Sequence, residues 1–163
     1  MKHPHRPHLL IALAALLTLS AAPNSSAQRT ASEDDVARAI NAAKQQIIVL
    51  APSLTGRRQA NGLLVAARVR GVKVYILSDT SIQGGNRVQS LSLMDGIQVR
   101  TLRNLRENTM ILDNRVLVTG PEATGEANPL EPQSTRVYTD AAILNKALGA
   151  FSRLWKTAKP FNL

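Results

Sequence analysis

The sequence contains no cysteine, and its three histidines, His3, His5 and His8, all lie close to the N-terminus. Aromatic residues are scarce too, with two phenylalanines, two tyrosines and one tryptophan. The absence of cysteine excludes disulfides and thiol nucleophiles, so packing alone has to stabilise the fold. The few aromatic rings give no sign of the stacking surface on which single-stranded nucleic acids are often bound.

The first 27 residues have the layout of a secretory signal peptide. A basic, polar opening, MKHPHRPH, is followed by the apolar run LLIALAALLTLSAA and by small residues at Ser25 and Ala27. This apolar run is short for a membrane span, which needs about 20 residues, although an uncleaved membrane anchor is the alternative. We therefore expect a signal peptide over residues 1–27, a single domain over residues 28–163, and a secreted or periplasmic protein.

Removal of this signal would leave a chain without histidine. Serine–histidine triads, histidine phosphoryl transfer, cysteine nucleophiles and the usual zinc sites are then excluded together, and we expect neither a metal nor a cofactor. The net charge falls only from +9 to +7, because Lys2 and Arg6 are lost and no acidic residue is. An exported basic protein tends to meet anions such as nucleic acid or phospholipid head groups.

Helical and extended patterns alternate along residues 28–163. After a polar leader over 28–32, Ser32 can cap a first helix, with Asp35 as its partner in a capping box. Residues 80–87 and 120–134 are predicted to be loops. The pattern predicts strands over 46–52, 72–79 and 97–102, a hairpin over 108–112 and 115–119, an edge strand over 135–139, and later helices over 57–70, 86–95 and 140–156. This order indicates an α/β domain with a mixed, mostly parallel sheet flanked by helices.

Several of these stretches together resemble one half of a phospholipase D superfamily protein. They are AINAAKQQIIVLAPSL, LLVAARVRGVKVYILSD, MDGIQVRTL, TMILDNRVLVTG and AFSRLW, and they span nearly all of residues 28–163. The resemblance implies the fold of that superfamily and a relation to phosphodiesterases. Small exported members with one signature per chain pair across a two-fold axis, so it also implies a homodimer or pairing with another phospholipase D-like chain.

The signature of this superfamily is a histidine, one residue, a lysine, four residues, an aspartate, six residues and a glycine. Counted from Asp113, Arg106 takes the place of the histidine and Asn108 that of the lysine, while Gly120 retains the glycine. In the superfamily the histidine attacks phosphorus, the lysine holds phosphate oxygens and the aspartate helps to orient the histidine. The guanidinium of Arg106 stays protonated and cannot attack. These four are relic positions, and no residue is assigned as catalytic.

Asp113 and Gly120 also have structural explanations. Aspartate is a favoured turn residue, and glycine permits backbone angles that other residues avoid. Either position can therefore be retained for folding alone.

Four arginines surround this signature. Arg100, Arg103 and Arg106 precede the hairpin, and Arg115 follows its turn. The resemblance places them near the phosphate cleft of the superfamily, and arginine pairs with phosphate through forked, charge-assisted hydrogen bonds. We therefore interpret them as an anion-binding group, with an ordinary solvated surface as the alternative.

The sequence favours an exported, catalytically inactive phospholipase D-like domain that binds an anionic, phosphate-containing ligand or partner, such as a phospholipid head group or nucleic acid. One alternative is a phosphodiesterase of the phospholipase D or endonuclease type, acting on phospholipid or nucleic acid with a partner chain that supplies the histidine. The other is a structural dimer without a ligand.

Overall fold

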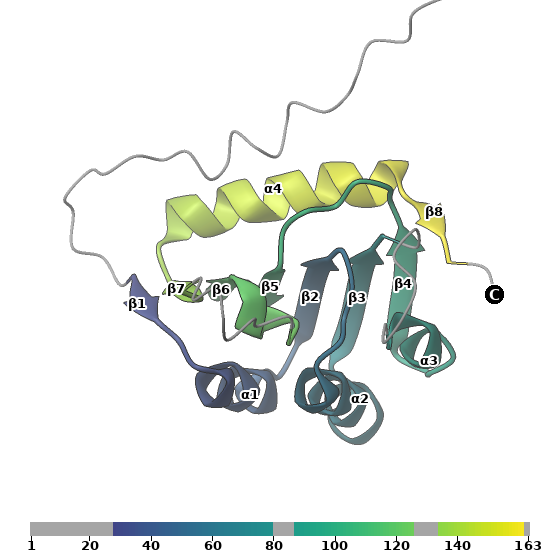
Figure 1. Ribbon diagram of the computed structural model, residues 1–163, viewed down its shortest axis with the longest axis horizontal. Helices are drawn as coiled ribbons and strands as arrows, with labels where there is room; N and C mark the ends of the chain where they lie inside the picture. The colour runs from purple at the N-terminus through teal and green to yellow at the C-terminus, as the bar shows by residue number, and fades with distance from the viewer. Residues whose placement is uncertain (1–27, 80–86, 126–133, 162–163) are drawn as a thin grey trace, which may run out of the picture.

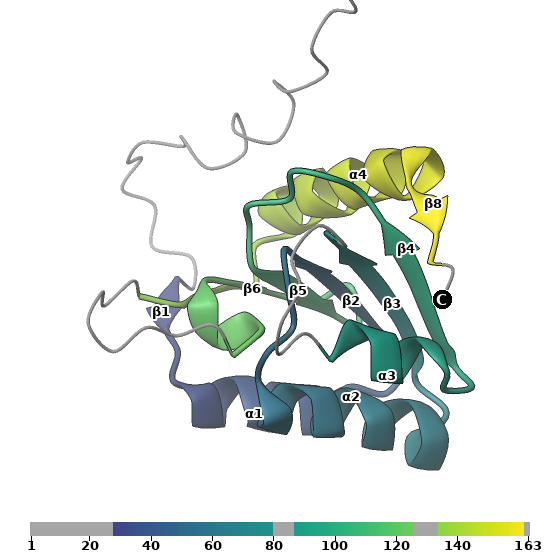
Figure 2. The same cartoon turned by 45° about the vertical axis from the view of Figure 1, so that its right-hand side comes forward.

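The computed structural model describes residues 28–79, 87–125 and 134–161. The described part has three layers, in which α4 covers one face of a sheet and α1, α2 and α3 cover the other (Figures 1 and 2). The predicted α/β class, with a mixed sheet flanked by helices, is confirmed. The predicted signal peptide and most of the two predicted loops lie outside the described residues.

The sheet has the strand order β1-β7-β6-β5-β2-β3-β4-β8. Its strands are β1 (Arg29–Thr30), β2 (Gln46–Ala51), β3 (Lys73–Ser78), β4 (Ile97–Thr101), β5 (Thr109–Leu112), β6 (Val116–Thr119), β7 (Arg136–Tyr138) and β8 (Lys159–Pro160). Only the pairs β2–β3 and β3–β4 are parallel, and the other pairs are antiparallel. Parallel pairing is thus confined to three neighbouring strands. We expected a mostly parallel sheet, so the fraction of parallel strand pairs is smaller than predicted.

The central strand β2 contributes side chains to both faces of the sheet. Ile47 and Val49 pack into the core beneath α1, α2 and α3, whereas Ile48 and Leu50 pack into the core beneath α4. All four are buried. Successive side chains of a strand point to opposite faces, so an unbroken apolar run is what a strand covered on both sides requires.

The helices are α1 (Glu33–Ala42), α2 (Arg57–Arg70), α3 (Val88–Ser92) and α4 (Ala141–Thr157). The capping box predicted for α1 is present: the Ser32 hydroxyl accepts the Asp35 N–H at 3.3 Å, and the Asp35 carboxylate accepts the Ser32 N–H at 3.0 Å. The hydrogen bond from the Ser32 backbone is the main cause that lowers the pKa of Asp35 below its ordinary value. The predicted end of α2 at Gly71 is also present, with φ 68°.

Arg70, in the last turn of α2, caps the neighbouring helix α1. Its guanidinium donates hydrogen bonds to the carbonyl oxygens of Ile40 at 3.0 Å, Asn41 at 2.5 Å and Ala43 at 2.9 Å. The contact with Asn41 satisfies a carbonyl group that the end of a helix leaves without an intrahelical partner. Arg70 is therefore a structural cation, and it joins α1 to α2.

Two sequence predictions about the edge of the sheet are wrong. The expected polar leader contains β1, and because β1 pairs outside β7, the strand expected at the edge over 135–139 is not the edge. A two-residue strand is too short to show an alternating pattern. The start of the expected surface loop over 120–134 is also packed inside, since Pro121 and Ala123, in a 3₁₀ turn over Pro121–Ala123, are buried.

Candidate functional site

The chain passes over the C-terminal ends of the parallel strands between β4 and β5. In the sheet order, β3 and β2 lie between β4 and β5, so the connection over residues 102–108 has to pass the ends of both (Figure 2). We call residues 102–108 the crossing segment. In open α/β sheets, the C-terminal edge of the parallel strands is where ligands bind.

Contacts at its start, middle and end hold the crossing segment in place. At the start, the N–H of Leu102 donates to the Ser78 carbonyl oxygen at 3.1 Å. The N–H of Asn104, which has a φ of 65°, donates to Oδ2 of the buried Asp79 at 2.5 Å. Leu105 is buried in the core beneath α4. At the end of the segment, the N–H of Gly120 donates to the carbonyl oxygen of Asn108 at 2.8 Å. The segment is therefore attached at its start, its middle and its end.

The anchored segment presents two cations to solvent. Arg103 and Arg106 are both exposed, and neither makes an ion pair within the part of the chain that the structure describes. Glu107 is half-buried between Arg106 and Asn108, and burial raises the pKa of its carboxyl group. The arrangement therefore combines free guanidinium groups with a carboxyl group that is harder to ionise than usual.

The other two arginines of the predicted anion-binding group do not join this pair, because Arg100 is engaged by Trp155 and Arg115 lies at the hairpin turn. The guanidinium of Arg100 lies 4.9 Å from the centroid of the Trp155 ring and donates to the Trp155 carbonyl oxygen at 2.7 Å, so it joins β4 to the end of α4. Arg115 is at the hairpin turn, and the whole length of β5 separates it from Arg106. The structure brings Arg103 and Arg106 to the same edge and does not bring Arg115 to them.

Asp113 lies at the far end of β5 from Arg106. Its carboxylate accepts three backbone hydrogen bonds, from the N–H groups of Lys44 at 2.8 Å, Gln45 at 2.8 Å and Gln46 at 3.0 Å. These donors belong to the connection between α1 and β2 and to the first residue of β2. The contacts fasten the hairpin turn to the start of the central strand, which fits the structural explanation of this aspartate.

Sequence reasoning missed Asp79 and its neighbours at the ends of β2 and β3. The hydroxyl of the buried Ser78 donates to the Pro52 carbonyl oxygen at 3.1 Å, and the N–H of Asp79 donates to the same oxygen at 3.2 Å. The signal in the sequence was an aspartate directly after a buried strand. Its place there predicts a polar group at the C-terminal edge of the sheet.

The comparisons with known proteins identify the family and the fold of this chain. Residues 36–155 match the family model described as "Cardiolipin synthase, PLD-like domain". The chain belongs to the phospholipase D-like family. The resemblance predicted from the sequence is therefore confirmed, whereas no curated protein sequence matches the chain.

Solved structures show the same phospholipase D-like fold. NucT from Helicobacter pylori matches with a TM-score of 0.67 and 18% identity over 78% of this chain and 89% of that one. Nuc from Salmonella typhimurium, a phospholipase D family member, matches with a TM-score of 0.65 and 22% identity over 84% and 96% of the two chains. TrmBL2, an archaeal chromatin protein, matches with a TM-score of 0.62 and 16% identity over 91% of this chain and 59% of TrmBL2.

Gly120, the glycine at the end of the phospholipase D-like signature, has a backbone conformation that favours glycine, with φ 125° and ψ 176°. A Cβ atom there would lie 2.7 Å from Cα and 2.6 Å from Oγ1 of Thr135. We therefore expect Gly120→Ala to lower the free energy of unfolding by about 3 kcal/mol, measured by urea denaturation. Gly149→Ala is the control, because that helical position has room for a methyl group. Equal stability of the two variants would contradict this prediction.

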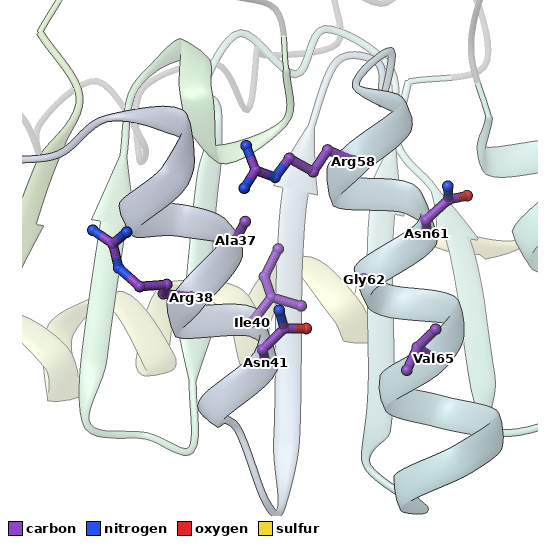
Figure 3. Close-up of a pocket in the computed structure, with 8 residues that line it drawn as sticks. All are labelled: Ala37, Arg38, Ile40, Asn41, Arg58, Asn61, Gly62 and Val65. Carbon is purple, nitrogen blue, oxygen red and sulfur yellow. The ribbon is translucent and has the colours of Figure 1, made fainter.

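A groove of about 250 Å³ lies between α1 and α2, on the outer helix layer of the phospholipase D-like domain (Figure 3). Two arginines line it, but both are engaged: Arg38 pairs with Asp35, at 2.6 Å, and Arg58 pairs with Asp34. No cluster of three or more acidic, histidine or cysteine residues suited to a metal occurs in the described ranges. Nor do these ranges contain a helix long and apolar enough to cross a membrane.

Proposed function

We propose that this chain is an exported phospholipase D-like domain that binds a phosphate-containing anionic ligand and does not form the covalent histidine intermediate of its family. The observation that carries the proposal is the position of Arg106. It stands at the place of the attacking histidine, on the segment that crosses the C-terminal edge, and no histidine occurs in residues 28–163.

The exposed guanidinium groups of Arg103 and Arg106 fit this function. A guanidinium group has no free lone pair with which to attack phosphorus, but its N–H groups match the oxygens of a phosphate in a forked arrangement. Both side chains are available, since no ion pair or hydrogen bond to a described residue engages them. TrmBL2, of which 59% matches this chain, is described as an archaeal chromatin protein with a novel mode of DNA binding, which supports nucleic acid as one candidate ligand.

Activity and binding assays on the processed protein test the proposal. We expect no turnover of an activated phosphodiester such as bis(p-nitrophenyl) phosphate. We also expect binding to a fluorescent phosphate-bearing probe, with an affinity that falls steeply as salt is raised. Phosphodiester cleavage through a phosphorylated covalent adduct would overturn the proposal, and so would the absence of phosphate binding at low salt.

Export is the second part of the proposal. The first strand, β1, begins at Arg29, and the N–H of Ala31 donates to the Thr135 carbonyl oxygen at 2.9 Å, so the described fold starts directly after the expected cleavage site. In a bacterial expression host with a Sec pathway, we expect an exported product whose intact mass corresponds to residues 28–163. If the new N-terminal Gln28 cyclises, that product is lighter by one ammonia. A full-length chain retained in the cytoplasm would contradict this prediction.

We also propose that the chain assembles as a two-fold dimer or pairs with another phospholipase D-like chain, as its membership of the family suggests. Light scattering of the processed protein measures the first possibility. If a partner chain supplied a histidine, phosphodiester turnover would occur only in the mixture of the two chains, and the enzymatic alternative would then be correct.

A further inference from the structure

The C-terminal end of the chain brings another cation to the edge that carries Arg103. Strand β8 pairs with β4, with Lys159 opposite Thr101, and the N–H of Phe161 donates to the Val99 carbonyl oxygen at 3.2 Å. Thr101 is the last residue of β4 and comes two residues before Arg103. Lys159 is exposed, so its charge lies beside the start of the crossing segment.

The end of α4 lies at the same corner of the domain. Arg100 of β4 holds Trp155 through the hydrogen bond and the ring contact described above, and the exposed Lys156 follows Trp155 in the last turn of the helix. Figure 1 shows the chain leaving β4 beside β8 and the C-terminal end of α4, and then running to β5. We define the basic strip as Lys156, Lys159, Arg103 and Arg106.

The four charges of the basic strip are not neutralised by described neighbours. None of the four side chains makes an ion pair or a side-chain hydrogen bond there. The described acidic residues next to the crossing segment are all at least partly buried: Asp79 holds the segment, Glu107 belongs to it, and Glu122 follows Gly120, whose N–H bonds its end. The exposed described acidic residues, Glu33, Asp34 and Asp95, belong to α1 or follow α3, on the other face of the sheet. Among the described residues, the strip therefore carries four positive charges without an ion-pair partner.

The side chains around the basic strip limit what it can bind. The large hydrophobic residues that are exposed in the described ranges, Val65, Val69 and Leu93, lie on α2 and after α3, in the opposite helix layer. Among the described residues, the strip thus has no fully exposed large apolar side chain for insertion into a lipid interface. Trp155 is half-buried against Arg100 and Phe151, so it offers no free face for base stacking.

We propose that the basic strip binds a linear chain of phosphates, as in a nucleic-acid backbone or inorganic polyphosphate, along Arg106, Arg103, Lys159 and Lys156. This inference rests on the proposed function and extends it from one phosphate group to several in succession. Arginine and lysine side chains from three separate segments lie along one edge. Such side chains can pair with successive phosphate groups of a linear ligand and do not depend on the base sequence of a nucleic acid.

A length series tests the inference with the processed protein. The probes are fluorescein-labelled single-stranded DNA of increasing length, with inorganic polyphosphate as the competing ligand. We expect the affinity to rise with length and then to level off once the strip is spanned. The double variant Lys156→Glu with Lys159→Glu should weaken binding of the long probe at least about tenfold and lower its salt slope by about 1 to 2. The affinity of this double variant for a dinucleotide should equal that of the unmodified protein.

The matched control carries the same charge reversal at the N-terminal ends of the parallel strands, opposite the crossing segment. Lys44 precedes β2 and Lys73 begins β3, both are exposed, and Lys44→Glu with Lys73→Glu changes the net charge equally. We expect this control to bind the long probe nearly as well as the unmodified protein. Competition by polyphosphate, by DNA or by both identifies which source of phosphates is recognised.

Failure of this inference differs from failure of the proposed function. If no phosphate compound binds at low salt, the proposed function is wrong. If the dinucleotide and the long probe bind alike, or if the two lysine variants behave alike, only the basic strip is refuted. Binding to phosphatidylglycerol vesicles without binding to DNA or polyphosphate would replace the linear chain by a membrane surface and would also refute the strip.

Discussion

Replacement of Asp113 by alanine is expected to lower the free energy of unfolding by about 2 to 3 kcal/mol. The substitution removes the acceptor of three backbone N–H groups, from Lys44, Gln45 and Gln46. It also places alanine at a φ of 50°, a left-handed conformation that aspartate and asparagine tolerate better. Because water reaches this surface turn, the loss stays below the full cost of three buried hydrogen bonds. Urea denaturation measures it.

Asp113→Asn is the informative companion variant. It retains an acceptor oxygen and the tolerance for the left-handed turn, so we expect a smaller loss of stability than with alanine. If both variants unfolded at the same urea concentration as the unmodified protein, the structural role of Asp113 would be disproved.

The charge of Asp113 also makes stability depend on pH. Burial acts to raise the pKa of Asp113, but the three backbone donors and the nearby Arg115 outweigh it, so the pKa lies below the ordinary value of 3.8. The stabilisation is therefore complete above that ordinary value and is lost as the pH falls through the lowered value of the folded state. In Asp113→Asn this part of the acid unfolding should be absent, while the contribution of Asp35 remains in both proteins.

Reversal of the charges of Arg103 and Arg106 is expected to have the largest effect on binding. In Arg103→Glu with Arg106→Glu, we expect affinity for a phosphate-bearing probe to fall about a hundredfold at low salt, because two attractive charges become repulsive. Folding should be preserved, since both side chains are exposed and unpaired among the described residues. Fluorescence anisotropy at several salt concentrations measures the change.

The control for this variant is Arg68→Glu with Lys73→Glu. Both residues are exposed, and they lie at the end of α2 and the start of β3, away from the crossing segment. Since the net charge changes equally, any difference between the two double variants reports on position. If both lose affinity to the same extent, binding depends on overall charge and the assignment of Arg103 and Arg106 is wrong.

Local patterns predicted most of the fold. The expected helix over 57–70 agrees with α2 at both ends, because its apolar spacing is regular and Gly71 supplies the left-handed residue that ends it. The hairpin around Asp113 and Asn114 was also predicted, and both residues have positive φ. These features depend on neighbouring residues, so the sequence carries them directly.

Features that depend on distant residues were not visible in the sequence. Arg115 is close to the signature in the chain, but a strand separates it from Arg106, and its position in the sequence does not show this. Lys159 reaches the edge only because β8 pairs with β4, some 60 residues earlier in the chain. Asp79 acts through the backbone of Asn104, a contact that leaves no pattern in either stretch.

The two ends of β5 differ in their structural roles, and this difference bears on which residues of such a domain can change. Asp113 secures the scaffold at one end, while Arg106, just before the other end, is exposed to solvent. Substitutions at Arg106 are therefore expected to carry little folding penalty, so the chemistry of this position can change while the domain stays folded. An aspartate at the position of Asp113 therefore reports on the architecture of the hairpin and is not by itself a sign of activity.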